Sequence, residues 1–241
     1  MNQAPYYSRE TDNIQVQSIV NDFVRSVYNW MAIGLALTGF VAFYVSSSQT
    51  LIRIIFGNPI IFYGMIIGEL ALVFVLGSRV NKMEASTATG LFILYSALNG
   101  ATLSSIFLVY SGSSIAQTFF ICAGTFIACS IYGMATKRDL TSVGNFMMMG
   151  LFGIIIASLV NMFFRSQGVE LIISYLGVFI FVGLTAYDTQ KIKVMALTRP
   201  ADLDDSIVRK GAIMGALSLY LDFINLFLML LRIFGGGSSR D

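Results

Sequence analysis

Long apolar blocks alternate with short polar breaks along the chain. Each block is close to the roughly 20 apolar residues that a helix needs to cross a bilayer. The breaks carry serine, proline, glycine or charged residues, as in "SSSQT", "RVNKME" and "TKRDLTS". The pattern predicts an all-α, polytopic membrane protein. Its seven transmembrane helices are expected at about residues 27–46, 59–78, 87–110, 115–135, 143–164, 171–190 and 211–232.

The two ends of the chain differ from these blocks. Residues 1–26 are polar and contain no short apolar core before a small-residue cleavage site, so we expect no signal peptide. Apolar residues at helical spacing from Ile14 to Val27 predict an amphipathic helix that lies on the membrane surface and leads into the first span. The glycine- and serine-rich residues 235–241 predict a flexible tail. The membrane domain is therefore expected at 27–234.

Composition agrees with the pattern and excludes several kinds of site. Of the 241 residues, 56% are hydrophobic and 12% are charged, whereas soluble domains carry about 25% charged residues. Histidine is absent, and Cys122 and Cys129 lie about 10 Å apart if the block is helical, too far for a disulfide. We therefore expect no zinc or haem site, no cofactor and no histidine-dependent catalysis. A net charge of +2 without a basic tract gives no sign of a nucleic-acid partner.

Lysine and arginine are distributed unevenly between the predicted loops. If the N-terminus is cytoplasmic, eleven of these cations face the cytoplasm and four, namely Arg53, Arg165, Arg232 and Arg240, face the opposite side. The excess of cations in cytoplasmic loops is the known determinant of orientation. The sequence thus predicts a cytoplasmic N-terminus and an external C-terminus.

Three acids fall inside the predicted spans, namely Glu69, Asp188 and Asp222, and the one base within these bounds, Arg232, is the last residue of the seventh span. A charge at membrane depth costs several kcal/mol, roughly, so each acid needs a partner, a proton or a water-filled cavity. Asp222 lies about 16 Å along the last span, near the bilayer midplane. Ser218 and Asn225 share its helix face. A purely structural role, in which protonated Asp222 makes an interhelical hydrogen bond, remains an alternative.

Asp188 and Arg79 are expected at similar depth. Asp188 lies near the end of the sixth span and would be interfacial unless the helix continues through Lys191. Arg79 ends the second span, ten residues after Glu69. We hypothesise that Arg79 reaches Asp188 in a closed state; the alternative is an arginine that extends to the interface.

Two carboxyl groups brought together in a low-dielectric site share one proton, because both cannot ionise cheaply. When both are deprotonated they can bind a hard cation such as calcium, which prefers oxygen ligands. Asp188 and Asp222 are therefore the candidate proton-sensing and ion-binding residues, with possible calcium binding. Further oxygens for an ion path are sought among Asn99, Asn161, Asn225, Tyr187 and Tyr220.

Four segments resemble motifs of the Bax inhibitor-1 family, also called the transmembrane Bax inhibitor motif family. They are "GLTAYDTQKIK" (183–193), "GALSLYLDFINLFLMLLRIFG" (215–235), "LYSALNGATLSSIF" (94–107) and "YGMATKRDLTSVGNF" (132–146). The resemblance extends over the chain from about Tyr28 and is nearest to bacterial inner-membrane members. It implies seven helices around a central C-terminal helix, and a pH-sensitive calcium leak controlled by an aspartate pair. On these motifs the pair is Asp188 and Asp222, the arginine latch is Arg79, and the membrane glutamate is Glu69.

Other functions are weighed against a leak channel. A regulatory or interaction protein without its own flux is the main alternative, since eukaryotic relatives are linked to cell-death control and some bacterial ones to a membrane protease. An intramembrane aspartyl protease would need GxGD and PAL motifs, which are absent, so no enzymatic activity is expected. A proton-coupled transporter would suit the buried acids, but the sequence indicates no substrate pocket. The expected partners are the lipid bilayer, calcium or protons, and a membrane protein.

Overall fold

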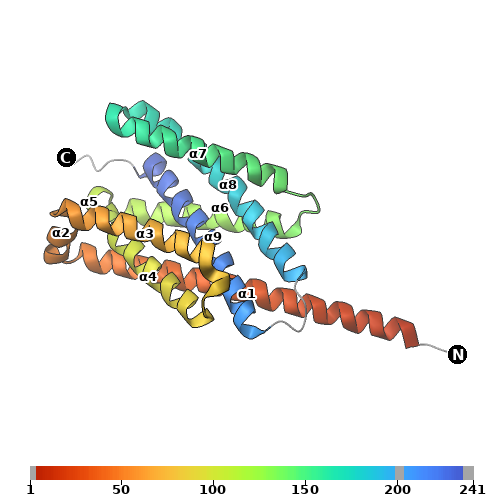
Figure 1. The fold of residues 1–241 in the computed structure, drawn as a ribbon. Helices are drawn as coiled ribbons and strands as arrows, with labels where there is room; N and C mark the ends of the chain where they lie inside the picture. The colour runs from red at the N-terminus through yellow and green to blue at the C-terminus, as the bar shows by residue number, and fades with distance from the viewer. Residues whose placement is uncertain (1–3, 199–203, 236–241) are drawn as a thin grey trace.

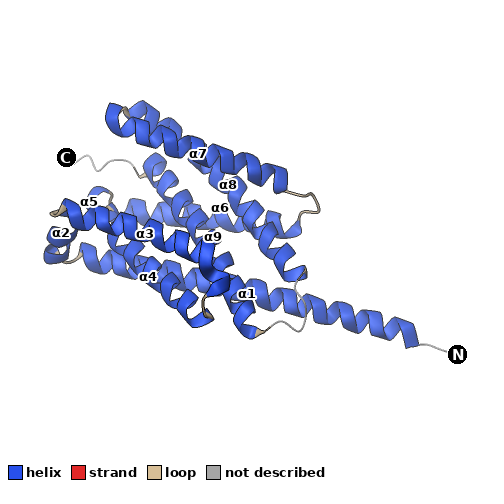
Figure 2. Ribbon diagram, in the orientation of Figure 1, coloured by secondary structure: helices blue, strands red, loops and turns tan. Residues whose placement is uncertain are grey.

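The computed structural model describes residues 4–198 and 204–235, and in these residues the chain is helical with no strand (Figures 1 and 2). The predicted tail, apart from Gly235, lies outside the described residues. The elements are α1 (Ala4–Ser46), α2 (Gln49–Phe56), α3 (Pro59–Arg79), the 3-10 helix η1 (Val80–Lys82), α4 (Ala85–Leu103), α5 (Ile106–Val109), α6 (Gly112–Ala135), α7 (Thr141–Phe164), α8 (Gln167–Leu197) and α9 (Asp205–Phe234).

All seven predicted spans are confirmed as helices long and apolar enough to cross a membrane. They comprise 18–46, 59–82, 85–109, 112–135, 141–164, 167–197 and 205–234. The short helices α2 and α5 connect spans at the end of the bundle away from the N-terminus (Figure 1). The protein is thus an all-α, multi-pass membrane protein.

Helix α9 is the centre of the bundle, as the resemblance implied. It packs against α1, α4, α6 and α8, whereas α3 packs chiefly on α4 and α7 on α8. Leu219, Tyr220 and Leu226 of α9 are completely buried. By contrast, Phe74 of α3 and Phe163 of α7 are about three-quarters or more exposed, at 74% and 81%. Such outer apolar faces suit contact with lipid.

The N-terminal segment does not form a separate surface helix. Helix α1 runs unbroken for 43 residues and projects from the bundle towards the N-terminus in Figure 1. The apolar face of the predicted amphipathic segment packs on protein: Phe23 lies beside Gly211 and Val27 beside Gly215, both on α9. Because this face is covered by α9, residues 18–27 continue the first span instead of lying against the lipid surface.

Helices α8 and α9 also extend into the stretch predicted as a long loop. Helix α8 continues to Leu197 instead of ending near residue 190, and α9 begins at Asp205 instead of near 211. The Asp204 carboxylate accepts a hydrogen bond of 2.7 Å from the Ser206 main-chain N–H and so caps α9. Asp188 therefore lies well inside a continuous helix and does not mark its end.

Candidate functional site

Asp188 and Asp222 line one cavity of about 640 Å³ between α7, α8 and α9. The two acids come from successive helices that pack directly on each other. The structure thus brings together the two acids that the sequence singled out.

The α9 side of the cavity is a polar stripe. Ser218, Asp222 and Asn225 all line the cavity, one helical turn apart. The Asn225 amide donates its Nδ2–H to the Leu221 carbonyl at 2.8 Å, which leaves Oδ1 available as an acceptor. Asp222 is only 5% exposed. Its Oδ2 atom is buried and has no hydrogen-bond partner among the described residues, so a proton, a water or a cation has a vacant acceptor there.

The α8 side contributes Asp188, which is half-buried. Lys191 follows less than one turn later on α8. Thr185 shares the helix face of Asp188, but its hydroxyl donates to the Phe181 carbonyl at 2.7 Å. Asp188 is therefore the α8 group free to act in the cavity.

The third wall comes from α7, which the sequence reasoning missed. Its side chains are mainly apolar, among them Leu151, Ile154 and Ile155. Ser158 is the polar exception, and its hydroxyl donates to the Ile154 carbonyl at 2.7 Å. An apolar wall lowers the local dielectric and strengthens every charge interaction in the cavity. Ser158 was the available signal, because every other residue from 146 to 160 is apolar or glycine.

The hollow continues towards the C-terminal end of α9. A neighbouring cavity of about 390 Å³ shares Ser158 and Met162 with the aspartate cavity and also contacts Arg165, Glu170 and Arg232. Arg232 Nε lies 3.8 Å from Glu170 Oε1, and both side chains are about half exposed. The two cavities together extend from the aspartates to the charged side chains of Arg165, Glu170 and Arg232.

Glu69 lies in a different place from the aspartate pair. Its carboxylate accepts hydrogen bonds from Asn99 Nδ2 at 3.1 Å and from the Thr102 hydroxyl at 2.8 Å, both on α4. Tyr220 of α9 donates its hydroxyl to Asn99 Oδ1 at 3.0 Å and lies 2.6 Å from the Thr38 hydroxyl of α1. A polar network thus joins α1, α3, α4 and α9, and it involves neither Asp188 nor Asp222.

Of the remaining sequence candidates, Asn161 and Tyr187 have structural contacts. Asn161 donates from Nδ2 to the Ser166 carbonyl at 3.1 Å, and its Oδ1 accepts from the Ser166 N–H at 3.0 Å. These two bonds stabilise the turn after α7. The Tyr187 ring covers Gly144 of α7.

Arg79 occupies the last turn of α3 and is exposed. Within residues 4–198 and 204–235 it forms no ion pair or hydrogen bond. The latch between Arg79 and Asp188 remains a prediction for another state.

The site has few strong metal ligands. The described residues contain no cluster of three or more His, Cys, Asp or Glu that could hold a metal ion. Calcium in a dedicated site takes six to eight oxygens, roughly, whereas this cavity offers two carboxylates with Ser218 and Asn225. Such a set fits weak, passing contact with a cation and not a storage site. Cys122 and Cys129 are free thiols away from this cavity.

Comparison with known proteins places the chain among bacterial membrane proteins. The sequence model of a family described as "Inhibitor of apoptosis-promoting Bax1" matches residues 20–240. "Inner membrane protein YbhL" of Escherichia coli (strain K12) is 50% identical over 229 residues, which cover 95% of this chain and 97% of that protein. An uncharacterized protein of Rickettsia prowazekii is 45% identical, with 91% and 90% covered. An uncharacterized membrane protein of Streptococcus pyogenes serotype M1 is 41% identical, with 90% and 93% covered. The family match contains six of the seven spans of the described residues in full and the first from residue 20 onward.

Proposed function

This chain belongs to the Bax inhibitor-1 family, and from that membership and the aspartate cavity we propose that it is a pH-sensitive leak channel for cations, calcium foremost. The inner membrane, where its Escherichia coli relative resides by name, is the proposed location. The observation that carries the proposal is the shared cavity of Asp188 and Asp222, in which one buried carboxylate oxygen of Asp222 has no hydrogen-bond partner among the described residues.

The composition of the site favours passage over storage. Conduction requires a site that attracts an ion but releases it again. Two acids with a hydroxyl and an amide oxygen supply fewer ligands than a tight calcium site needs. The continuation of the hollow past Ser158 to Arg232 supplies a route away from the aspartates on one side.

The protonation of the pair would couple the leak to pH. A shared proton occupies the same oxygens that a cation would use, so the two ligands are linked. Arg79 is exposed and unpaired in the described structure, and it would close the path by reaching Asp188. We also propose that the chain has no enzymatic activity and needs no cofactor.

Flux through liposomes tests the proposal. Purified protein is reconstituted with an enclosed calcium-sensitive dye, and uptake is followed from about pH 5 to about pH 8, the range in which a proton-sharing pair can titrate. The wild-type chain is expected to pass calcium with a pH dependence that Asp188→Asn and Asp222→Asn alter. Asp205→Asn, the same change at an exposed position of α9, is expected to behave as wild type.

Two results would contradict a leak. One is calcium uptake no faster than that of protein-free liposomes at every pH, with protein that is folded and inserted. The other is an unchanged pH profile in both aspartate variants. The first result would favour the alternative, a membrane regulatory or interaction protein without its own flux, which the description "Inhibitor of apoptosis-promoting Bax1" of the matching family supports.

A further inference from the structure

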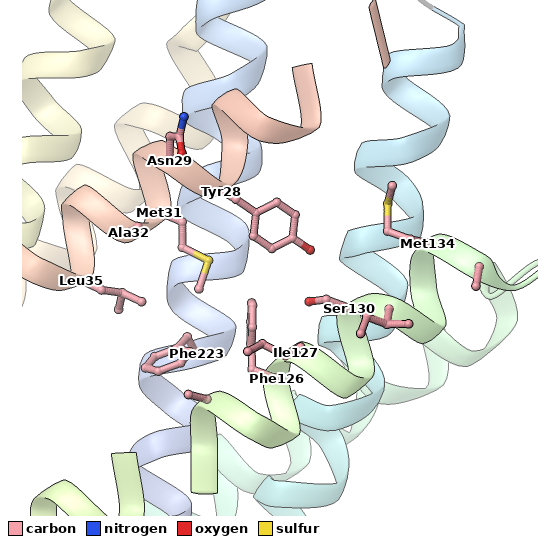
Figure 3. A pocket seen from close by; sticks show the side chains of 13 residues that line it. Tyr28, Asn29, Met31, Ala32, Leu35, Phe126, Ile127, Ser130, Met134 and Phe223 are labelled. Atoms are coloured by element: carbon pink, nitrogen blue, oxygen red, sulfur yellow. The ribbon is translucent and has the colours of Figure 1, made fainter. Parts of the chain in front are cut away.

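A second large hollow lies between α1 and α6 (Figure 3), and none of its lining residues belongs to α7. Its volume is about 800 Å³. Helix α1 packs against α4, α8 and α9, and α6 packs against α8 and α9, so the two walls are joined through other helices. Phe223 of α9 lies at the back of the cleft (Figure 3). The cleft is thus a gap between two spans within the membrane domain.

The lining of the cleft is mainly apolar. Leu35 and Phe126 are typical, and Ala32, Ile127 and Ile131 are exposed within it. A pocket of this size with mainly apolar walls falls within the range of about 300–1,000 Å³ that is usual for small-molecule sites. In a bilayer the apolar material next to such a gap is the acyl chain of a lipid, which is as apolar as a leucine side chain.

Hydroxyl groups converge at one end of the cleft. Figure 3 shows Tyr28 and Ser130 directed towards one another from α1 and α6. Each is bonded to Thr189 of α8, Tyr28 at 3.4 Å and Ser130 at 3.5 Å. Hydrogen bonds between hydroxyls are usually 2.5–3.0 Å long, roughly, so these two are weak. The hydroxyls can therefore turn to bond ester oxygens at the base of a lipid headgroup.

Cations surround the same end. Arg25 lies one turn before Asn29 on α1, and Lys137 and Arg138 follow Ala135 at the end of α6. All three are exposed and form no ion pair or hydrogen bond through their side chains in the described part of the chain. Lys193 of α8 donates its ammonium to the carbonyl of Met134, another lining residue. Four positive charges thus lie next to the polar end of an apolar cleft.

The nearby acids offset these charges only in part. Asp139 follows Arg138 and accepts hydrogen bonds from the Thr141 N–H at 2.8 Å and hydroxyl at 2.6 Å, and it is one negative charge beside four positive ones. Asp22 lies almost one turn farther from the cleft than Arg25 on α1. Positive clusters between spans attract anionic lipid headgroups.

We propose that the cleft between α1 and α6 binds one anionic phospholipid. Its acyl chain occupies the space beside Ala32 and Ile127, and its phosphate lies against Arg25, Lys137 and Arg138. The lipid belongs to the leaflet on the N-terminal side of the bundle. The site is separate from the aspartate cavity, and its occupation does not depend on cation flux.

Native mass spectrometry of the full chain tests the proposal. The protein is titrated with phosphatidylglycerol and with phosphatidylcholine of identical acyl chains, and the first bound lipid is quantified. The wild-type chain is expected to bind phosphatidylglycerol more tightly. The double variant Lys137→Gln/Arg138→Gln should lose roughly tenfold or more in this affinity, because each cation near an anionic headgroup strengthens binding by about fivefold. The matched control Arg53→Gln/Lys82→Gln removes the same charge from two exposed residues on α2 and η1, elements that contribute no residue to the cleft, and it should bind like wild type.

A second pair of variants tests the acyl-chain space. Ala32→Trp fills the cleft and should abolish the tight phosphatidylglycerol site. Ala36→Trp, one turn along α1 at an exposed position outside the cleft, should retain it. Equal affinity for the two lipids would overturn the proposal. So would unchanged phosphatidylglycerol binding in folded Ala32→Trp or in Lys137→Gln/Arg138→Gln.

Discussion

Two polar residues on α9 define two separate sites. Tyr220 and Asp222 are two positions apart, which places their side chains roughly 200° apart around the helix. Tyr220 faces the network with Asn99 and Thr38, and Asp222 faces the cavity with Asp188. Asn99 gives its Nδ2–H to Glu69, so its Oδ1 must accept from Tyr220. The Tyr220 hydroxyl is therefore a required donor.

Loss of that donor should destabilise the fold. Tyr220→Phe leaves the Asn99 Oδ1 without its donor in a buried place, which costs about 1–3 kcal/mol. The measurement is the thermal unfolding midpoint of the purified protein in detergent. Tyr95→Phe is the matched control, because Tyr95 packs its ring on Tyr220 at 5.6 Å but its hydroxyl forms no hydrogen bond in the described residues. Equal losses in the two variants would refute this role of the hydroxyl.

The polar stripe of Ser218, Asp222 and Asn225 was predictable because helical spacing alone fixes which residues share a face. The partners of Glu69 were not predictable, since they depend on which helices become neighbours. Nothing in the spacing of Glu69 and Asn99 along the chain indicates that α3 packs on α4 at this register. The pairing of Asp188 with Asp222 was expected from the family resemblance, and not from the spacing.

Close helix contacts decide which substitutions an element tolerates. At Gly133 of α6, an added Cβ would lie 2.3 Å from the main-chain oxygen of Ala186 on α8. A backbone atom cannot move aside as a flexible side chain can. The glycine thus allows α6 and α8 to approach each other at the level of Thr189, which bonds Ser130.

Alanine at this glycine should push the two helices apart. Gly133→Ala is expected to cost about 1–3 kcal/mol through overpacking. Gly124→Ala, on the same helix with open space around its Cβ position, should be neutral or stabilising by up to about 1 kcal/mol, because alanine is the better helix former. Thermal unfolding of both variants provides the measurement. An equally stable Gly133→Ala protein would contradict the close contact.

The start of α7 should give the fold a dependence on pH. Hydrogen bonds from the Thr141 hydroxyl and N–H hold the pKa of Asp139 below its usual value. Since the folded-state pKa is the lower one, the stabilisation is complete above the unfolded pKa of about 4 and is lost as pH falls through the folded pKa. Asp139→Ala should therefore unfold at a lower temperature than wild type near neutral pH.

The difference between Asp139→Ala and wild type should shrink in acid below the folded pKa, which thermal unfolding at several pH values would reveal. Asp22→Ala, at an exposed acid with no hydrogen-bond partner in the described residues, should show no comparable effect. A constant difference at every pH would argue against the hydrogen-bonded carboxylate as the cause.

Hydropathy located the spans but not their ends. The windows that predicted α8 ended near residue 190 because Lys191 and Lys193 are charged, yet the helix continues to Leu197. Main-chain hydrogen bonding, and not the polarity of the side chains, decides where a helix stops. The same limit explains α1, whose polar first part joins the first span without a break.

At the scale of the whole molecule, the seven candidate spans of the described residues predict that the start of α1 and the end of α9 lie on opposite sides of the membrane. Helix α1 begins and α9 finishes at opposite ends of the bundle in Figure 1. The cation excess in the loops on the N-terminal side predicts that this side is cytoplasmic.

Fusion of a reporter to the C-terminus tests this orientation. Alkaline phosphatase, which folds only after export, should be active at the C-terminus, and green fluorescent protein fused there through the same export route should be dark. A fusion after Lys82 on the N-terminal side should give the reverse pattern. An inactive phosphatase at the C-terminus would reverse the predicted orientation, and the leaflet on the N-terminal side, which holds the proposed lipid, would then face the exterior.

Helix α9 connects the two polar sites of the bundle, because it carries residues of both. Asn99 hydrogen-bonds both Glu69 and Tyr220, and Asp222 lies on the same helix as Tyr220, two residues away. If protonation of the aspartates moves α9, a change in the Glu69 network that favours one position of α9 over the other shifts the pH midpoint of the proposed leak by that difference in free energy. A residue with no access to the ion would then tune the pH at which the membrane becomes permeable.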